Sequence, residues 1–525
     1  MRLHSCVVVL LVLSFSQSEL RPHLTKELHF AAFCDLTSIN RSGKLCPFNP
    51  LDRAKAPVIL TEKSLESLMN LDAVLAKIDD NMPGATDRLL GLLRLPSIST
   101  DPAYKADCDA AADWLVTELQ DLGIDASKRT TSGHPMVVGH TGDSGPHILF
   151  YGHYDVQPVD PIELWDHDPF DPVVEETASG RVIRGRGTAD DKGQFMTFIE
   201  ACRAWKEVHG SLPGRITFLF EGEEECSSPS LVPFLQDNAK ELHADFALIC
   251  DTAMHDTQTP AIVTMLRGLL GEGLEISGPD KDLHSGYFGG AAINPIRVLA
   301  DIIAGLHDDQ GRITIPGFYD GVPDMPPALL AQWDALDFDP ATFLGDVGLS
   351  EPAGETGRSV LEMMWARPTC DVNGIWGGYT GDGFKTVLPA QASAKISFRL
   401  VGTQDPLKIR AAFREQVRAQ LPPDCSVTFS DHGASAASQM STANPAFEKA
   451  RNALSDEWPK PAAYIGCGGS IPIAGHFRDI LGMDSLLIGF GQADDQLHSP
   501  NEKYNFDSFH KGTRSWARIL QALNA

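Results

Sequence analysis

The sequence has little of three things: cysteine, long apolar runs and positive charge. Its 525 residues include ten cysteines, none in a Cys-x-x-Cys pair, which argues against a zinc ribbon or a thioredoxin-like redox centre. The longest apolar run, Cys6 to Leu13, is far shorter than the ~20 residues that span a bilayer. Asp and Glu outnumber Lys and Arg by 70 to 43, and the net charge of −27 repels phosphate backbones and anionic lipid. We therefore expect no nucleic acid and no membrane as partners.

The remaining composition is that of a folded globular protein, with 43% hydrophobic and 22% charged residues. The sequence contains no His-Glu-x-x-His, Gly-x-Ser-x-Gly or Walker motif, which argues against the enzyme classes that those motifs mark. Three cysteines, Cys226, Cys250 and Cys467, lie in apolar or glycine-rich stretches and are interpreted as buried free thiols. Sparse, unpaired cysteine favours a cytoplasmic location.

The N-terminal segment, residues 1–68, differs from the rest of the chain. It carries eight Lys/Arg and six Asp/Glu, so the excess of negative charge lies entirely beyond it. Arg2, an apolar run and a small polar stretch have the shape of a short secretory signal peptide, although no Ala-x-Ala site follows. Two hypotheses stay open: a spurious or processed leader before a protein that begins at Met69, or a genuine signal to a secreted or periplasmic location. In both cases we expect residues 1–68 to pack poorly.

The body of the chain alternates short apolar runs with helical patterns. Continuous apolar runs predict strands buried on both faces, as in a parallel sheet. A helical pattern at Gln194 to Val208 lies between the first two of them and gives a βαβ unit. We predict an α/β fold with a mixed, mostly parallel sheet flanked by helices; the predicted strands are residues 147–151, 215–220, 246–250 and 485–490.

The middle of the chain has a different residue pattern, with loops rich in glycine and proline, a predicted strand of alternating polarity at 392–400 and a predicted helix at 406–421. We interpret it as an inserted α+β lid and dimerisation domain. The predicted organisation is a leader (1–68), a first catalytic segment (69–261), the inserted domain (262–434) and a second catalytic segment (435–525), whose helices lie at 447–454 and 508–523.

Acids and histidines follow each predicted strand of the sheet. Because ligands of open α/β sheets collect beyond the carboxyl ends of the strands, these groups are expected to converge. A lone histidine or acid would be an ordinary core residue or helix cap, but five groups at one sheet edge are harder to explain that way. They are centred on His153 with Asp155, Asp190 with Asp191, Glu224 with Glu225, Asp251, and His498.

Two imidazoles and three carboxylates can hold two divalent cations if one carboxylate bridges them. In His153-x-Asp155 the two side chains share a face of an extended segment, so Asp155 can orient the imidazole. Glu224 and Glu225 are adjacent and point in different directions, so one can bind metal while the other stays free as a general base.

The motifs together resemble the co-catalytic dizinc peptidases of the aminoacylase and glutamate carboxypeptidase type, most closely the carnosinase and cytosolic non-specific dipeptidase branch. The resemblance covers residues 147 to 510 and rests on these segments, in order: Gly-His153-Tyr-Asp155-Val-Gln-Pro, Gly-Arg-Gly-Thr-Ala-Asp190-Asp-Lys-Gly, Phe-Glu-Gly-Glu-Glu224-Glu225, Asp251-Thr, Lys-Asp-Leu-His284-Ser-Gly, Phe-Arg399-Leu-Val, Gly-Gly-Ser470-Ile-Pro and His498-Ser-Pro-Asn-Glu.

The resemblance implies a role for each residue. His153 and Asp251 would complete one metal site and Glu225 and His498 the other, with Asp190 bridging and a cis Asp190–Asp191 peptide. It further implies two divalent ions per subunit, zinc first, with manganese or cobalt as alternatives, and a homodimer. The remaining roles are Glu224 as general base, Asp155 as orienter, His284 as a histidine of the inserted domain acting in the partner's site, and Arg399 and Ser470 as substrate-binding residues.

The implied activity is hydrolysis of dipeptides by metal-activated water, with a small peptide as substrate. Relatives often carry Arg-Glu before Gly-Gly-Ser-Ile-Pro, whereas this chain has Gly466-Cys467, so its substrate preference is open. The alternative enzyme is an N-acyl amino acid deacylase of the acetylornithine or succinyl-diaminopimelate type. A remote alternative is a non-catalytic binding protein on a peptidase fold, although such decay usually deletes ligands and here all are present.

Overall fold

The computed structural model describes residues 62–178, 180–469 and 471–525. Contacts divide the chain after Asn70, and the packing described below is that of residues 71–525. The first helix, α1 (Glu62–Leu93), begins before the predicted boundary at Met69. Residues 1–61, most of the predicted leader with its signal-like stretch, lie outside the described residues. Within the described residues, no helix is long and apolar enough to cross a membrane.

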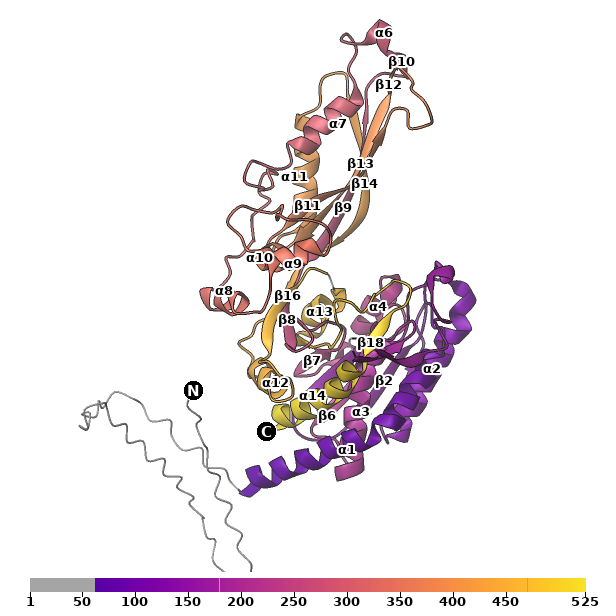
Figure 1. Cartoon of the computed structure of the whole chain (residues 1–525), viewed down its shortest axis with the longest axis vertical. Helices are drawn as coiled ribbons and strands as arrows, with labels where there is room; N and C mark the ends of the chain where they lie inside the picture. Colours follow the sequence, from indigo (N-terminus) through magenta and orange to yellow (C-terminus); the bar gives the residue numbers. More distant parts are fainter. Residues whose placement is uncertain (1–61, 179, 470) are drawn as a thin grey trace, which may run out of the picture. The chain divides into compact units, whose positions relative to one another are not determined.

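A nine-stranded mixed sheet organises the main part of the fold, in the order β1-β2-β6-β3-β7-β17-β8-β15, with β16 on β8 (Figure 1). Its four neighbours β6, β3, β7 and β17 are parallel, and antiparallel pairs extend the sheet on both sides. The predicted α/β fold is therefore confirmed, with its parallel strands at the centre of the sheet. The strands are β1 (Asp125–Arg129), β2 (Met136–Thr141), β3 (His147–His153), β6 (Arg215–Glu221), β7 (Phe246–Ile249), β8 (Ala261–Leu266), β15 (Ser438–Gln439), β16 (Ala463–Cys467) and β17 (Asp484–Leu487).

Helices cover both faces of this sheet, because successive residues of the central strands alternate between two apolar cores. In β3, Ile148 and Phe150 belong to one core and Leu149 and Tyr151 to the other. Helices α1, α2 (Lys105–Asp121), α3 (Lys192–His209), α12 (Pro445–Ser455) and α14 (Phe506–Asn524) supply the first core. Helices α4 (Leu231–Asp237), α5 (Ala239–Leu242), α8 (Pro327–Asp334), α10 (Val360–Trp365) and α13 (Pro472–His476) supply the second.

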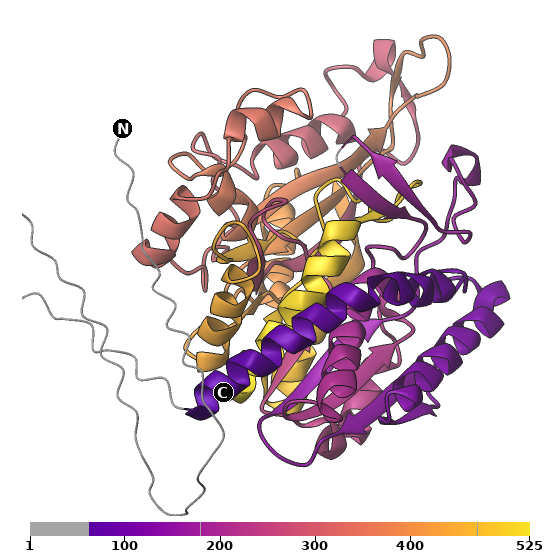
Figure 2. The same ribbon diagram turned by 60° about the horizontal axis from the view of Figure 1, so that its bottom comes forward.

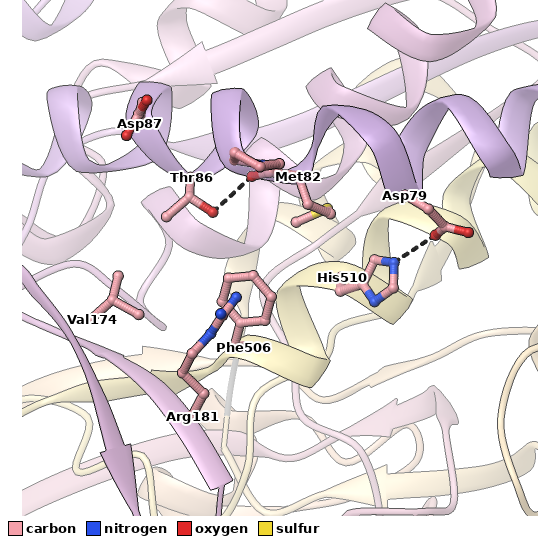
Figure 3. A pocket seen from close by; sticks show the side chains of 9 residues that line it. Asp79, Met82, Thr86, Asp87, Val174, Arg181, Phe506 and His510 are labelled. Carbon is pink, nitrogen blue, oxygen red and sulfur yellow. Dashed lines mark hydrogen bonds and ion pairs between the residues drawn. The ribbon is translucent and has the colours of Figure 1, made fainter.

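A small three-stranded sheet, in the order β18-β5-β4, ties the C-terminal helix to the main body; its strands are β4 (Val173–Thr177), β5 (Gly180–Arg184) and β18 (Lys503–Asn505). Figure 2 shows α1 running beside α14, and His510 Nε2 lies 2.7 Å from Asp79 Oδ1 between these helices. A pocket opens next to this contact, where the Arg181 guanidinium lies 3.3 Å from the centre of the Phe506 ring (Figure 3).

The inserted segment builds a second, antiparallel sheet in the order β11-β13-β9-β14, with α7 and α11 along one face and an apolar core of its own (Figure 1). A short ladder, β10 with β12, precedes α6. The elements are β9 (Gly268–Ser277), β10 (Leu283–His284), α6 (Ser285–Phe288), α7 (Pro295–Ala304), α9 (Pro340–Gly345), β11 (Thr369–Gly377), β12 (Val387–Leu388), β13 (Gln391–Leu400), α11 (Pro406–Ala419) and β14 (Ser426–Ser435).

Two helices of the segment predicted as the inserted domain pack elsewhere. Trp333 of α8 and Trp365 of α10 belong to the second core of the nine-stranded sheet, with ring centres 5.2 Å apart. The Trp333 indole also donates to the carbonyl of Tyr464 in β16. The segment 262–434 is therefore not a uniform lid, because part of it covers the main sheet.

A protein that begins at Met69 is expected to fold and to keep its activity. Among the side chains that the structure describes, Leu71, Val74, Leu75 and Ile78 of α1 enter the core at helical spacing. We expect the melting temperature to change by less than about 4 °C, the shift that ~1 kcal/mol causes at most in a domain this large. Thermal denaturation and peptidase assays of both lengths test this; a larger loss would show that the leader is structural.

Candidate metal centre

The five predicted metal ligands lie together at the carboxyl edge of the parallel strands. His153 ends β3, Asp251 follows β7, Glu225 follows β6, His498 lies in the loop after β17, and Asp190 lies two residues before the start of α3. Their ligand atoms form two triads, each within 4.8 Å: His153, Asp190 and Asp251, and Asp190, Glu225 and His498. Asp190 is common to both, so the geometry has the form expected of a bridging carboxylate.

The two oxygens of Asp190 face the two imidazoles separately. His153 Nε2 lies 3.1 Å from Asp190 Oδ1 and 3.9 Å from Asp251 Oδ2. His498 Nε2 lies 2.9 Å from Asp190 Oδ2 and 3.3 Å from Glu225 Oε2. The Asp190–Asp191 peptide is cis, as the resemblance implied.

Unpartnered buried atoms show that this donor set suits cations. His153 Nδ1 contacts the carbonyl of Asp155 at 3.1 Å, which leaves Nε2 to face the cluster, where it lies near carboxylate oxygens of Asp190 and Asp251 without a hydrogen bond of good geometry. Glu225 Oε1 is likewise buried without one. Buried polar atoms rarely stay unsatisfied in folded proteins. Two imidazole nitrogens and three carboxylates, one of which is common to both triads, are a suitable donor set for two divalent ions such as zinc or manganese.

The acids hold protons on both imidazoles when no cation is bound. Asp190 and then Glu225 raise the pKa of His498 to about 10. Burial opposes the charge on His153, but Asp155 and Asp190 outweigh it and raise the pKa of His153 well above its ordinary value. A metal ion can bind only by displacing these protons.

Metal affinity is therefore expected to rise with pH. At pH 6 to 8, each ion that binds through an imidazole of raised pKa releases at least one proton, and burial also raises the pKa of Asp251 beside His153. The association constant should therefore rise at least about tenfold per pH unit. Competition against a chromophoric chelator at several pH values measures the slope. An affinity that does not change between pH 6 and 8 would show that the imidazoles are not ligands.

The two acids beside Glu225 have different environments. Glu223 accepts hydrogen bonds from the backbone amides of His134 (2.9 Å) and Ser230 (3.0 Å), so its carboxylate is committed to the backbone. Within the described part of the chain, the Glu224 carboxylate has no hydrogen-bond or ion-pair partner. Burial raises the pKa of Glu224 to about 7. A half-buried, unpartnered carboxylate next to a metal ligand suits proton transfer.

Asp155 connects the two halves of the centre. Its carbonyl accepts from His153, and its carboxylate accepts from the backbone amides of Glu224 (3.2 Å) and Glu225 (3.0 Å). The predicted orienting contact with the imidazole therefore runs mainly through the backbone of Asp155, since its Oδ1 lies farther away, at 3.4 Å.

Two residues that sequence reasoning did not single out support the ligands. Gln157 donates to Glu225 Oε2 at 2.7 Å. The buried Glu502 accepts from Arg186 Nη1 (2.8 Å) and from the amides of Gly187, Ala189 and Asp190 (2.8–3.1 Å), so it holds the loop that carries the bridging acid. Arg186 and Glu502 both belong to motifs that carry the resemblance to the dizinc peptidases, but only the fold shows that their side chains form an ion pair.

Three predicted site residues are not part of the cluster. His284 is exposed, caps α6 by accepting from Gly286 and contacts the Tyr287 ring at 4.8 Å. Arg399 lies in β13 of the inserted sheet, opposite Thr369 and Leu269. Ser470 lies outside the described residues.

Comparisons with known proteins identify the family. The sequence profile of the peptidase family M20/M25/M40 matches residues 149–522. The chain belongs to this family. It is 30% identical over 472 residues to the Cys-Gly metallodipeptidase dug1 of Schizosaccharomyces pombe, covering 87% of this chain and 98% of that protein. It is 30% identical to the Beta-Ala-His dipeptidase of Homo sapiens, covering 77% of this chain and 76% of that protein. The structure of the M20 metallo-carboxypeptidase Sso-CP2 of Sulfolobus solfataricus is also similar, with a TM-score of 0.72, 30% identity and coverage of 84% and 99%.

The family membership confirms the predicted class of enzyme, a metal-dependent peptidase, and the resemblance on which that prediction rested. Both curated relatives carry the names of dipeptidases, in agreement with the predicted dipeptide hydrolysis.

Proposed function

We propose that this member of the family hydrolyses dipeptides at the centre built on Asp190, with two divalent cations, zinc first. The observation that carries the proposal is the pair of triads that share Asp190, with the unpartnered Glu224 beside them. His153 and Asp251 would hold one ion, Glu225 and His498 the other. Bound there, the two ions supply Lewis acidity, which polarises the peptide carbonyl and makes a water molecule more acidic.

Glu224 performs the proton transfers. It takes a proton from the attacking water as the oxygen adds to the carbonyl carbon, and returns a proton to the amine nitrogen as the C–N bond breaks. Asp155 fixes the backbone of this acid through the amide of Glu224 and keeps His153 in the tautomer that turns Nε2 toward the cluster. Arg399 binds the terminal carboxylate of the substrate through its planar guanidinium, helped by Ser470.

A substrate panel tests the activity: two dipeptides, β-alanyl-histidine, a tripeptide and an N-acetyl amino acid, each with zinc and with manganese. Faster hydrolysis of dipeptides supports the proposal. Faster hydrolysis of the N-acetyl amino acid would indicate the deacylase, and no hydrolysis at all would indicate a binding protein.

We further propose that the enzyme is a homodimer in which His284 stabilises the reaction's oxyanion in the partner's site. His284 is exposed, and its short ladder of β10 with β12 is a separate two-stranded sheet of the inserted segment, whereas the five predicted ligands come from elements of the main sheet or its loops. A two-fold dimer, the commonest assembly, lets a histidine of one lid reach the other chain's site.

Complementation is expected to reveal this arrangement. His284→Ala and Glu224→Gln should each be inactive alone, whereas mixed dimers should regain activity, because one site then combines Glu224 of one chain with His284 of the other. The measurement is the rate after subunit exchange, with exchange verified by differently tagged chains. Rates that stay at those of the separate variants would contradict action in trans.

We propose the cytoplasm as the location. The seven cysteines that the structure describes are all free thiols, a state that reducing compartments maintain. Fractionation of cells that express the full chain and the form beginning at Met69 tests this; export that depends on residues 1–68 would favour a secretion signal.

A further inference from the structure

Two arginines stand side by side on the face of the inserted sheet that carries no helix. Arg399 in β13 lies opposite Leu269 in β9, and Arg267 precedes Leu269 by two residues. Residues two apart in an extended chain share a face, so the two arginines are diagonal neighbours. The opposite face carries Leu270 and Phe398, which are buried in the core with α7 and α11.

No acid forms an ion pair with these two arginines in the described part of the chain, although the charge of Asp371 partly offsets that of Arg267. Among the described residues, neither arginine has an ion pair; Arg399 has no side-chain hydrogen bond, and Arg267 has one, from Nε to the carbonyl of Gly468 at 3.1 Å. Asp371 shares their face, but its carboxylate accepts from the Thr369 hydroxyl and pairs with neither. Burial, and then the positive charge of Arg399, lower the pKa of Arg267. Two neighbouring guanidinium groups, neither of them ion-paired, suit an anion.

Arg267 packs against the loop of Gly468 and Gly469, which follows β16. The backbone of Arg267 donates to the carbonyl of Gly469, and its guanidinium lies so close to Gly468 that a Cβ there would be 2.8 Å from Nη2. The thiol of Cys467, just before these glycines, is affected by charges of the metal cluster and of the two arginines. Burial and the charge of Asp251, a residue of the metal cluster, raise the pKa of its thiol, whereas Arg267 and Arg399 lower it.

We propose that Arg267 and Arg399 form one two-guanidinium pocket, which makes the enzyme prefer dipeptides whose last residue is Asp or Glu. The inference rests on the proposed dipeptidase function. Arg399 binds the terminal carboxylate and Arg267 the side-chain carboxylate of that residue. Cys467 lies close enough to Arg267 and Arg399 for their charges to act on its thiol, and a carboxylate introduced at that position would repel a second acid of the substrate.

The test compares kcat/KM for two matched substrate pairs, Ala-Glu with Ala-Gln and Ala-Asp with Ala-Asn. The natural enzyme should prefer the acid of each pair by about tenfold or more, the size of one charge-assisted hydrogen bond. In Arg267→Met the preference should fall to about one, chiefly through slower hydrolysis of the acidic peptides. Cys467→Glu should lower the same ratio without removing a guanidinium.

Arg451→Met is the matched control, because this arginine of α12 pairs with Glu448 of the same helix and should leave the preference intact. Equal rates for acid and amide in the natural enzyme would overturn the inference but not the dipeptidase. An equal fall for all four peptides in Arg267→Met would also overturn it and assign Arg267 to holding the glycine loop. No hydrolysis of any of the four by the natural enzyme would overturn the dipeptidase proposal itself.

Discussion

Glu224→Gln is expected to lower kcat by about 10²–10⁴-fold while the protein still binds two metal ions per chain. The amide keeps the volume of the acid but cannot take a proton from water. Metal binding should persist, because Glu224 belongs to neither triad of ligand atoms. The measurements are steady-state kinetics on a dipeptide and the metal content of the purified variant.

The control for this variant is Glu223→Gln, the same change one residue earlier. Its carboxylate accepts from the amides of His134 and Ser230, so losing one acceptor should cost about 1–3 kcal/mol of folding free energy and little activity. If Glu224→Gln retained activity near that of the natural enzyme, the general base would lie elsewhere, and an inactive but folded Glu223→Gln would point to Glu223.

Glu502→Ala is expected to have the largest effect on stability, a loss of about 3–5 kcal/mol. Removing this acid leaves the guanidinium of Arg186 buried without its counter-charge and frees the amides of Gly187, Ala189 and Asp190. Because the freed loop carries the bridging acid, metal affinity should fall as well. Denaturant unfolding and metal titration measure the two effects.

Glu355→Ala is a matched control for that variant. Glu355 forms a similar buried pair with Arg367, at 2.8 Å, and touches no residue of the metal cluster. It should lose comparable stability and keep its metal affinity. Equal loss of metal affinity in both variants would show that Glu502 acts only through global stability.

The strands and the clustering of the five predicted metal ligands were predictable from the sequence because they depend on local patterns. Continuous apolar runs marked β3, β6 and β7, and the first polar residues after such strands must lie at the carboxyl edge. The pairing of Arg186 with Glu502 was not predictable in this way. The two residues are far apart in the chain, and only the packing of β18 against β5 brings them together.

The packing of α8 and α10 against the main sheet was also not predictable from the sequence. Both are short helices inside a stretch rich in glycine and proline, and their residue pattern does not differ from that of the inserted domain around them. Their tryptophans enter the second core of the main sheet. Which core receives them depends on which apolar surface the other helices leave uncovered. A short apolar pattern indicates that a helix has a buried face but does not tell which core receives it.

Asp155 constrains how this enzyme can change during evolution. Its carbonyl orients an imidazole of one triad, and its carboxylate holds the backbone of both the unpartnered acid and a ligand of the other triad. A substitution of Asp155 would disturb the orientation of His153 and the backbone positions of Glu224 and Glu225 at the same time. Selection for a change in one of these contacts therefore also alters the other two. Adaptation to a new metal or a new pH range is therefore more accessible through residues that serve a single ligand, such as Gln157 beside Glu225.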